Sequence, residues 1–326
     1  MKRRTFVALG GTALAAPRAL LAQPAKRVYR IAIFDEASEK VRVREYAAFR
    51  RRLRELGLVE GSTVIYEVHS SQGETDRLPA LAARLVATKP DIILCSGTPS
   101  ARAAMRVTAT IPIVFVASGD PVGTGLVKSL SRPGGNVTGF SASSPEIALK
   151  AIELLREMAP GIKRIAYLAD PSNPASVTVY SRMEELARKL NMSIQLLDGI
   201  GQAALERSFA LIGKEQIQAL VVSASGGLLE QRNQVVLFAS RKKLPVVYTR
   251  RDYVDEGGLM SYGIHRIPLY VRSAELVHRI LQGAKPGDIP VEQIAVIQMV
   301  LNLKTARAQG IRIPDSVRLR ADEVIE

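Results

Sequence analysis

The chain has one cysteine, three histidines and no tryptophan among its 326 residues. Cys95 alone cannot form an intramolecular disulfide, and no cysteine follows the N-terminal apolar segment for lipid attachment. His69, His265 and His278 are scattered and match no metal-ligand spacing. No G-x-x-x-x-G-K-[ST] or G-x-G-x-x-G stretch occurs. We therefore expect no catalytic residues, no metal and no cofactor.

Long apolar runs are also missing. The run from Val7 to Ala16 is shorter than the ~20 residues of a membrane span. It follows Lys2-Arg3-Arg4, and the segment ends in Leu20-Leu21-Ala22. This pattern predicts an export signal over residues 1–22. Arg3-Arg4 followed by Phe6 indicates the twin-arginine route, and an ordinary Sec signal is the alternative. We expect a periplasmic protein without a lipid anchor.

Acidic residues are fewer than basic residues: the chain has 31 Asp and Glu and 45 Lys and Arg, which gives a formal net charge of +14. An excess of this size raises the question of a nucleic-acid partner. Many of the arginines, from Arg42 to Arg54, fall in one predicted helix whose other face carries Tyr46, Phe49 and Leu53. We interpret them as a solvated helix face. Because no zinc spacing, helix-turn-helix signature or aromatic RNA-binding motif accompanies them, we expect no nucleic-acid partner.

Strand and helix patterns alternate through the rest of the chain, which is typical of an α/β fold built from βαβ units. The predicted strands are residues 28–34, 63–68, 92–95, 111–116, 137–140, 164–169, 194–197, 219–222, 245–248 and 294–301. We predict two Rossmann-like lobes with parallel sheets, joined by a multi-strand hinge. Lobe 1 comprises residues 28–140 with 264–290, and lobe 2 comprises residues 141–260 with 291–326. Glycine-flanked residues 257–263 are expected to be a return crossing between the lobes.

Small polar residues follow several predicted strands. Ser96-Gly97-Thr98 and Ser118-Gly119-Asp120 come after two buried strands, and Thr98 with Pro99 fits the start of a helix. Open α/β sheets place their ligands at such strand ends. Two lobes of this kind would form a cleft that closes around a small molecule.

Several long stretches carry a resemblance. They include TIPIVFVASGDPVGTGLVKSLSRPGGNVTGFS, EGGLMSYG and LNLKTARAQGIRIPDSVRLRADEVIE. Together they resemble ABC-transporter substrate-binding proteins with a type I periplasmic-binding fold, in the branch related to binders of tryptophan and other aromatic amino acids. The resemblance implies a ligand in the cleft and delivery to a membrane permease with its ATPase. We expect a monomer. A sensor that presents its closed form to a membrane receptor is the alternative function.

By this resemblance, Ser96, Gly97 and Thr98 would meet a ligand carboxylate, and a helix N-terminus favours an anion there. The alternative is that the two hydroxyls only cap the helix. Asp120, with Ser118 beside it, is the expected partner of a ligand ammonium group. Its alternative role is to satisfy the turn before Pro121.

Further ligand-binding residues are expected at the strand ends of lobe 2, namely Asp170, Asn173, Ser223, Tyr248 and Arg250. Arg250 could hold a carboxylate in a bidentate manner. Because the chain has no tryptophan, an aromatic cage would depend on Phe34, Tyr248 or Tyr262. Two segments depart from the pattern of the family that the chain resembles, namely Phe34-Asp35-Glu36 and Ile264-His265-Arg266.

Overall fold

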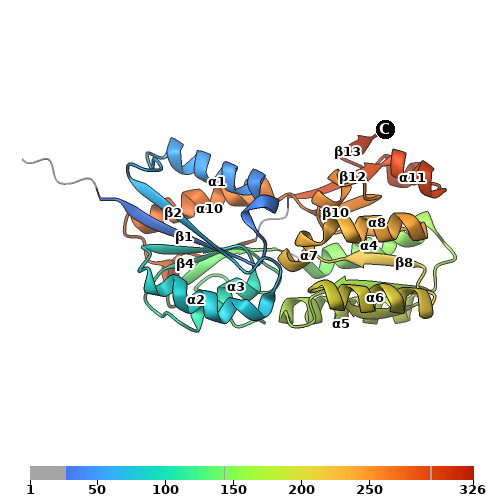
Figure 1. The fold of residues 1–326 in the computed structure, drawn as a ribbon, viewed down its shortest axis with the longest axis horizontal. Coiled ribbons are helices and arrows are strands. Elements are labelled where there is room, and N and C mark those ends of the chain that lie inside the picture. The colour runs from blue at the N-terminus through green and yellow to red at the C-terminus, as the bar shows by residue number, and fades with distance from the viewer. Residues whose placement is uncertain (1–26, 143, 294–295) are drawn as a thin grey trace, which may run out of the picture.

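The computed structural model describes residues 27–142, 144–293 and 296–326. The predicted export signal lies outside these residues. The described chain forms two α/β lobes that lie side by side along the long axis of the molecule (Figure 1). Among the described residues, no helix has the length and apolar character needed to cross a membrane.

Lobe 1 contains a six-stranded sheet in the order β11-β5-β4-β3-β1-β2, and every strand pair in it is parallel. Its strands are β1 (Tyr29–Asp35), β2 (Val64–Ser70), β3 (Ile92–Cys95), β4 (Ile113–Ser118), β5 (Val137–Ser141) and β11 (Glu292–Gln293). The apolar runs of β3 and β4 are buried on both faces, as expected for central parallel strands. Their C-terminal ends point toward lobe 2.

Two helices cover each face of the lobe 1 sheet (Figure 1). The helices are α1 (Val43–Glu55) and α10 (Arg266–Leu281) on one face, and α2 (Leu78–Ala87) and α3 (Thr98–Met105) on the other. The short 3-10 helices of this lobe are η1 (Glu39–Val41), η2 (Thr75–Arg77) and η3 (Pro286–Asp288). The rings of Tyr46 on α1 and Tyr270 on α10 lie 5.9 Å apart, so the apolar faces of helices distant in sequence complete one core.

Lobe 2 contains a seven-stranded sheet in the order β13-β12-β10-β9-β8-β6-β7, in which only the β10–β12 pair is antiparallel. Its strands are β6 (Arg164–Ala169), β7 (Ser193–Asp198), β8 (Ala219–Val222), β9 (Val246–Tyr248), β10 (Met260–Ile264), β12 (Ile297–Asn302) and β13 (Glu323–Ile325). Its helices are α4 (Ser144–Met158), α5 (Pro174–Lys189), α6 (Gln202–Lys214), α7 (Gly226–Glu230), α8 (Arg232–Lys242), α9 (Asp252–Asp255), α11 (Leu303–Gln309) and α12 (Asp315–Arg318). Helices α4 and α5 pack on one face of the sheet, and α6 and α8 pack on the other.

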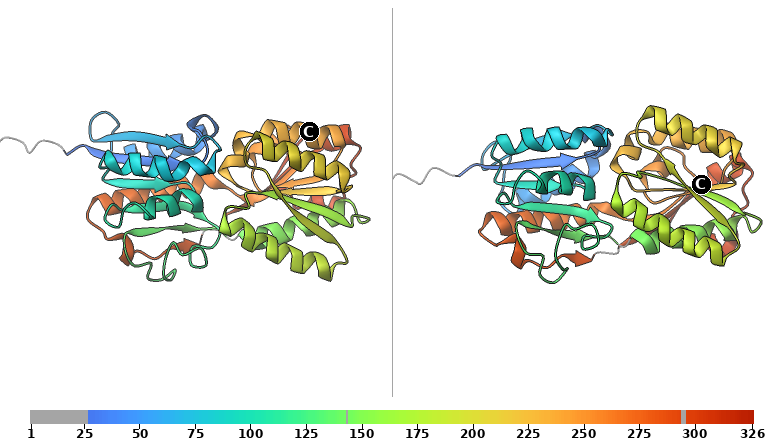
Figure 2. Two further views of the ribbon diagram at one scale, coloured as in Figure 1. Left: turned by 60° about the horizontal axis from the view of Figure 1, so that its bottom comes forward. Right: turned by 90° about the horizontal axis from the view of Figure 1, so that it is seen from below.

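The chain passes between the lobes after β5, after β10 and after β11. Figure 2 shows the two lobes side by side in both further views. The crossing points differ from the predicted ones. Strand β5 continues in the lobe 1 sheet to Ser141, and β11 pairs with β5 instead of joining lobe 2. Residues 260–263 of the expected return crossing lie in strand β10 (Met260–Ile264), inside the lobe 2 sheet.

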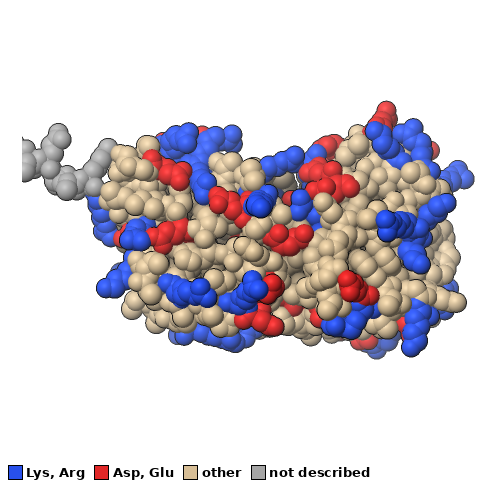
Figure 3. All heavy atoms as spheres, viewed as in Figure 1, with Lys and Arg blue, Asp and Glu red and all other residues tan. Residues whose placement is uncertain are grey.

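The predicted helix that carries the arginines from Arg42 to Arg54 begins only at Val43, because Arg42 has a non-helical φ of −113°. Its side chain is buried, which corrects the prediction of a solvated position, whereas Arg44, Arg51 and Arg54 are exposed. On the face shown in Figure 3, Lys and Arg are spread over both lobes with Asp and Glu among them. The positive charge on that face is therefore dispersed.

Candidate ligand-binding site

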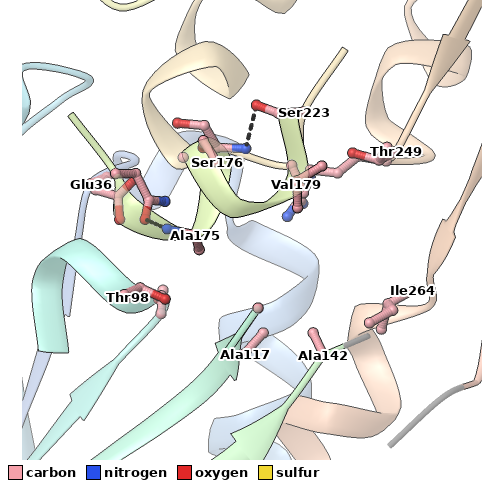
Figure 4. Close-up of a pocket in the computed structure, with 18 of the residues that line it drawn as sticks. Glu36, Thr98, Ala117, Ala142, Ala175, Ser176, Val179, Ser223, Thr249 and Ile264 are labelled. Carbon is pink, nitrogen blue, oxygen red and sulfur yellow. Dashed lines mark hydrogen bonds between the residues drawn. The ribbon is translucent and has the colours of Figure 1, made fainter. Parts of the chain in front are cut away.

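A cavity of about 120 Å³ lies between the two lobes. It is bounded by residues that follow the C-terminal ends of β1, β3 and β4 in lobe 1 and of β6, β8 and β9 in lobe 2. Figure 4 shows Thr98 and Ala117 from lobe 1 on one side, with Ser176, Val179 and Ser223 from lobe 2 across from them. The cavity is thus at the place where parallel α/β sheets hold ligands.

The loop from β3 to α3 forms part of the lobe 1 wall through Ser96, Gly97 and Thr98. The Ser96 Oγ lies 2.9 Å from the hydroxyl of Tyr270, and the Thr98 Oγ1 lies 2.9 Å from the Oγ of Ser118. The N-cap of α3 is Gly97, so Thr98 is the first helical residue instead of the predicted cap. Both hydroxyls are held by other hydroxyls and keep capacity for a further hydrogen bond.

The lobe 2 wall includes Asn173 and Ser223. Asn173 caps α5, because its Oδ1 accepts from the backbone N–H of Ala175 at 3.0 Å. The Ser223 side chain accepts from the backbone N–H of Ser225 at 3.4 Å. These two residues therefore shape the wall and also order the loops that carry them.

Arg250, which follows β9, is buried with 3% of its surface exposed. Its Nη2 donates to the Oε1 of Glu45 in lobe 1 at 2.9 Å, and its Nε donates to the Oδ2 of Asp252 at 2.9 Å. Burial favours loss of the Arg250 proton, but the carboxylates of Asp252 and Glu45 outweigh it and raise the pKa of Arg250. The predicted carboxylate binder is thus already engaged with two protein carboxylates, one of them across the cleft.

Arg42 forms a second buried ion pair. Its Nε donates to the Oδ2 of Asp35 at 2.9 Å, and its Nη2 donates to the Oδ1 of the same carboxylate at 3.3 Å. The hydroxyl of Tyr46 donates to the Asp35 Oδ2 at 2.8 Å. This bidentate pair has the geometry of the stronger charge-assisted hydrogen bonds. It fixes Arg42 at the lobe 1 side of the cavity.

Arg266, the first residue of α10, also lines the cavity. Its Nη2 donates to the backbone carbonyl of Ser96 at 3.0 Å, and its guanidinium carbon lies 5.7 Å from the centre of the Tyr270 ring. Among the described residues no carboxylate pairs with Arg266. Burial and the neighbouring guanidinium groups of Arg42 and Arg250 lower the pKa of Arg266.

Glu36 completes the ionisable lining and has 5% of its surface exposed. Burial, assisted by the charges of Asp35 and Asp170, raises its pKa to about 8. The charge of Arg42 and a hydrogen bond from the backbone N–H of Gly226 act in the opposite direction. Glu36 is consequently mostly neutral at pH 7, on a wall that already holds three guanidinium groups.

Known proteins share this two-lobed architecture. The model of the family described as ABC transporter substrate binding protein matches residues 30–325. The chain belongs to this family. It is 29% identical over 279 residues to a tyrosine-binding protein of Clostridioides difficile, spanning 85% of this chain and 78% of that protein. The family consists of solute-binding proteins and not of enzymes, and the predicted α/β fold with two lobes is confirmed.

Two solved structures are informative about the arrangement of the lobes in this substrate-binding protein. A domain from Streptococcus pneumonia in complex with L-Trp is 28% identical, covers 91% of this chain and 100% of that one, and has a TM-score of 0.83. A ligand-free, open substrate-binding protein with adhesive properties from Clostridium difficile is 25% identical, covers 92% and 99%, and has a TM-score of 0.61.

The cavity gathers about half of the residues expected to bind the ligand, namely Ser96, Gly97, Thr98, Asn173, Ser223 and Arg250. The aromatic candidates lie elsewhere. Phe34 is fully buried in the core of lobe 1, and Tyr248 stacks on Tyr253 at 4.7 Å in the core of lobe 2. Tyr262 packs against the other core of lobe 2. Strand alternation directs these rings into the sheet layers and away from the cleft, so they form no aromatic cage.

The remaining three candidates are Asp120, Asp170 and Ser118, and each forms hydrogen bonds with neighbouring protein groups. Asp120 accepts from the backbone N–H of Gly123 at 2.8 Å and borders a separate, wider groove. Asp170 accepts from the backbone N–H and the hydroxyl of Ser172 at 2.9 and 2.6 Å. Ser118 is fully buried behind Thr98. Asp120 has thus adopted its alternative role as a turn residue, and Glu36 is the carboxyl group that lines the cavity.

Glu36, Arg42 and Arg266 line the cavity although the sequence did not single them out as binding residues. Glu36 and Arg266 lie in the two segments that depart from the family pattern, Phe34-Asp35-Glu36 and Ile264-His265-Arg266. These departures were the sequence feature that could have pointed to both residues. Arg42 gave no such signal, because it stands among surface arginines in the sequence. Within the described ranges, no group of three or more His, Cys, Asp or Glu residues is arranged to hold a metal ion.

Proposed function

We propose that this protein is the periplasmic solute-binding component of an ABC importer and that it captures an amino acid or a related carboxylate by closing its two lobes. The observation that carries the proposal is that buried polar groups from both lobes converge on one cavity. Arg42 and Ser96 come from lobe 1, and Arg250 and Ser223 come from lobe 2. Relatives named for binding tyrosine or bound to L-Trp support an amino-acid ligand.

The arrangement of the lobes supports a closing mechanism. This structure resembles the L-Trp complex, at a TM-score of 0.83, more closely than the ligand-free open structure, at 0.61, although the sequence identities are similar. Interlobe contacts are extensive: Glu45 pairs with Arg250, Arg44 with Asp255, and the backbone N–H of Ser38 with the Glu230 carboxylate. A ligand that touches both lobes would favour this closed form by differential affinity.

A thermal-shift screen of the mature protein tests the binding function. The panel contains L-amino acids, aromatic acids, short carboxylates and neutral sugars. A ligand that binds only the folded state raises the melting temperature. We expect a rise of several degrees with at least one amino acid or carboxylate and none with the sugars. A response confined to the sugars, or to no compound, would contradict the proposal.

Uptake measurements separate an importer from a sensor. Cells that lack the gene should lose high-affinity uptake of the labelled ligand if the protein serves a permease. Normal uptake combined with loss of a transcriptional or motile response would instead favour the sensor.

Export is tested by fractionating cells that carry Arg3→Lys together with Arg4→Lys. Retention of the precursor in the cytoplasm is expected for the twin-arginine route. Normal export of this variant would indicate the Sec route.

A further inference from the structure

Arg266 is a half-buried cation, and no carboxylate among the described residues pairs with it. Its Nε atom is inaccessible to solvent and has no hydrogen-bond partner among the described residues. It also occupies the first turn of α10, where the helix dipole disfavours a positive charge. A charge that is partly withdrawn from water is also normally paired, because leaving it unpaired is costly. The position of Arg266 on the cavity wall indicates that the missing anion comes from the ligand.

The other two guanidinium groups of the cavity support this interpretation. Arg42 and Arg250 are 2% and 3% exposed, and each has a solvent-inaccessible Nη1 without a hydrogen-bond partner in the described part of the chain. Their charges are already balanced by Asp35, by Glu45 and by Asp252. Arg42 and Arg250 can thus donate further hydrogen bonds, whereas Arg266 also requires a negative charge. One carboxylate satisfies this requirement.

Glu36 provides the complementary group. It lies beside Gly97 of lobe 1 and Gly226 of lobe 2, and the charges that act on it come from Asp35, Asp170 and Arg42. An ammonium group placed against Glu36 would replace its proton and form an ion pair. An α-amino acid carries both of the charges that Arg266 and Glu36 require.

The apolar part of the cavity lining is mainly aliphatic. Its apolar walls are formed by Ala117, Ile147, Ala148, Val179 and Ile264, and Tyr167 is the only aromatic residue of the described lining. The cavity therefore offers mainly aliphatic contacts to the side chain of a ligand.

We infer that the cleft binds an aliphatic α-amino acid, with its carboxylate on Arg266 and its ammonium group on Glu36. This inference rests on the proposed function and specifies its substrate class. It assigns to this chain a ligand different from the aromatic ones of its named relatives.

Calorimetric titration of the mature protein with a matched series of compounds tests the substrate class. The series comprises L-alanine, L-valine, L-leucine, L-phenylalanine and L-tryptophan, with 3-methylbutanoate and isobutylamine as valine lacking its amine or its carboxylate. We expect at least one of L-alanine, L-valine and L-leucine to bind at least tenfold more tightly than L-tryptophan and than either truncated compound. Tighter binding of L-tryptophan would overturn the inference while the proposed function stands. Binding of none of these compounds would also overturn the inference, whereas the proposed function is decided by the wider thermal-shift panel.

Variants test the two anchors. Arg266→Gln should weaken L-valine binding at least about 30-fold and remove the preference for L-valine over isobutylamine, because its effect is on carboxylate recognition. Arg266→Lys should recover part of the affinity. The matched control is Arg272→Gln on the same helix, where the exposed side chain pairs with Glu292, and it should bind like the unsubstituted protein. Equal affinities in Arg266→Gln and Arg272→Gln would overturn the assignment.

Proton release tests Glu36. Titrations of L-valine in two buffers of different ionisation enthalpy should reveal the release of roughly one proton per ligand at pH 7, since the bound ammonium group ionises Glu36. In Glu36→Gln this release should disappear and the affinity should fall. Binding without proton release in the unsubstituted protein would overturn the role of Glu36.

Discussion

The Nη2 of Arg250 in lobe 2 donates to the Oε1 of Glu45 in lobe 1 at 2.9 Å, and both side chains are buried. The pair spans the cleft directly beside the ligand cavity. Glu45 is also 3.6 Å from the Nη1 of Arg42, so this one carboxylate links a guanidinium group from each lobe. In the proposed closing mechanism this contact would form only in the closed state, because opening would separate its two partners.

Glu45→Gln should therefore weaken ligand binding more than it weakens the fold. Removing one partner of a buried ion pair is strongly destabilising, and here the cost falls on the closed form. We expect the calorimetric affinity for L-valine to fall on the order of tenfold or more. Arg44→Gln is the control, because Arg44 forms an exposed interlobe pair with Asp255, and it should change the affinity less than about threefold. Equal effects of the two substitutions would contradict this assignment.

Gly226→Ala should hinder closure by a steric mechanism. A Cβ at Gly226 would lie 2.9 Å from the Cβ of Glu36 in the opposite lobe and 3.4 Å from the Nη2 of Arg42. The open form is free of this clash, so thermal stability should change little while the affinity for L-valine falls at least about tenfold. Gly213→Ala, where an added Cβ meets nothing within 4 Å, is the control. Unchanged affinity in Gly226→Ala would show that the lobes do not approach this closely in solution.

Glu36→Gln should alter the pH dependence of stability. The pKa of Glu36 is about 8 in the folded protein against an ordinary value of 4.5, so between these pH values the folded state binds more protons than the unfolded state. Stability therefore falls as pH rises through this window, and Glu36→Gln removes that loss. Urea denaturation without ligand should show the variant gaining on the order of 3 kcal/mol relative to the unsubstituted protein between pH 5 and pH 8. Parallel stability profiles of the two proteins would refute the role of burial at Glu36.

Asp120→Ala should leave ligand affinity unchanged. Asp120 holds the turn after β4 through its hydrogen bond from Gly123 and does not line the cavity. Losing this hydrogen bond should lower the free energy of unfolding by about 1 kcal/mol. Calorimetry combined with urea denaturation separates the two effects. A large loss of affinity would return Asp120 to the binding site.

Local sequence patterns predicted the sheets well. The apolar run of β4 predicted a strand that is buried between two layers of helices. The polar residues after β3 follow the end of such a strand and line the cavity between the lobes. Local patterns could not predict where the chain crosses from one lobe to the other, because these points depend on where pairing between distant strands stops. Tyr262 is an example, since β10 acquires its place in the lobe 2 sheet only by pairing with β9 and β12.

The charged part of the site was harder to predict. Arg42 has the same local sequence character as its exposed neighbours, and its burial is decided by Asp35 seven residues earlier and by lobe 2 across the cleft. Arg266 and Glu36 come together at the cavity from positions more than two hundred residues apart. The residue pattern of one segment does not show which distant residues will meet in the fold. The polar loop after β4 therefore led to Asp120 as the predicted carboxylate of the site.

Small-angle X-ray scattering of the mature protein, before and after addition of L-valine, tests the central claim that ligand binding closes the two lobes. The ligand-saturated protein should have a smaller radius of gyration than the free protein, and its scattering curve should match the closed structure described here. Gly226→Ala should resist this compaction. An unchanged radius of gyration in the unsubstituted protein, at ligand concentrations that calorimetry shows to be saturating, would contradict closure as the binding mechanism.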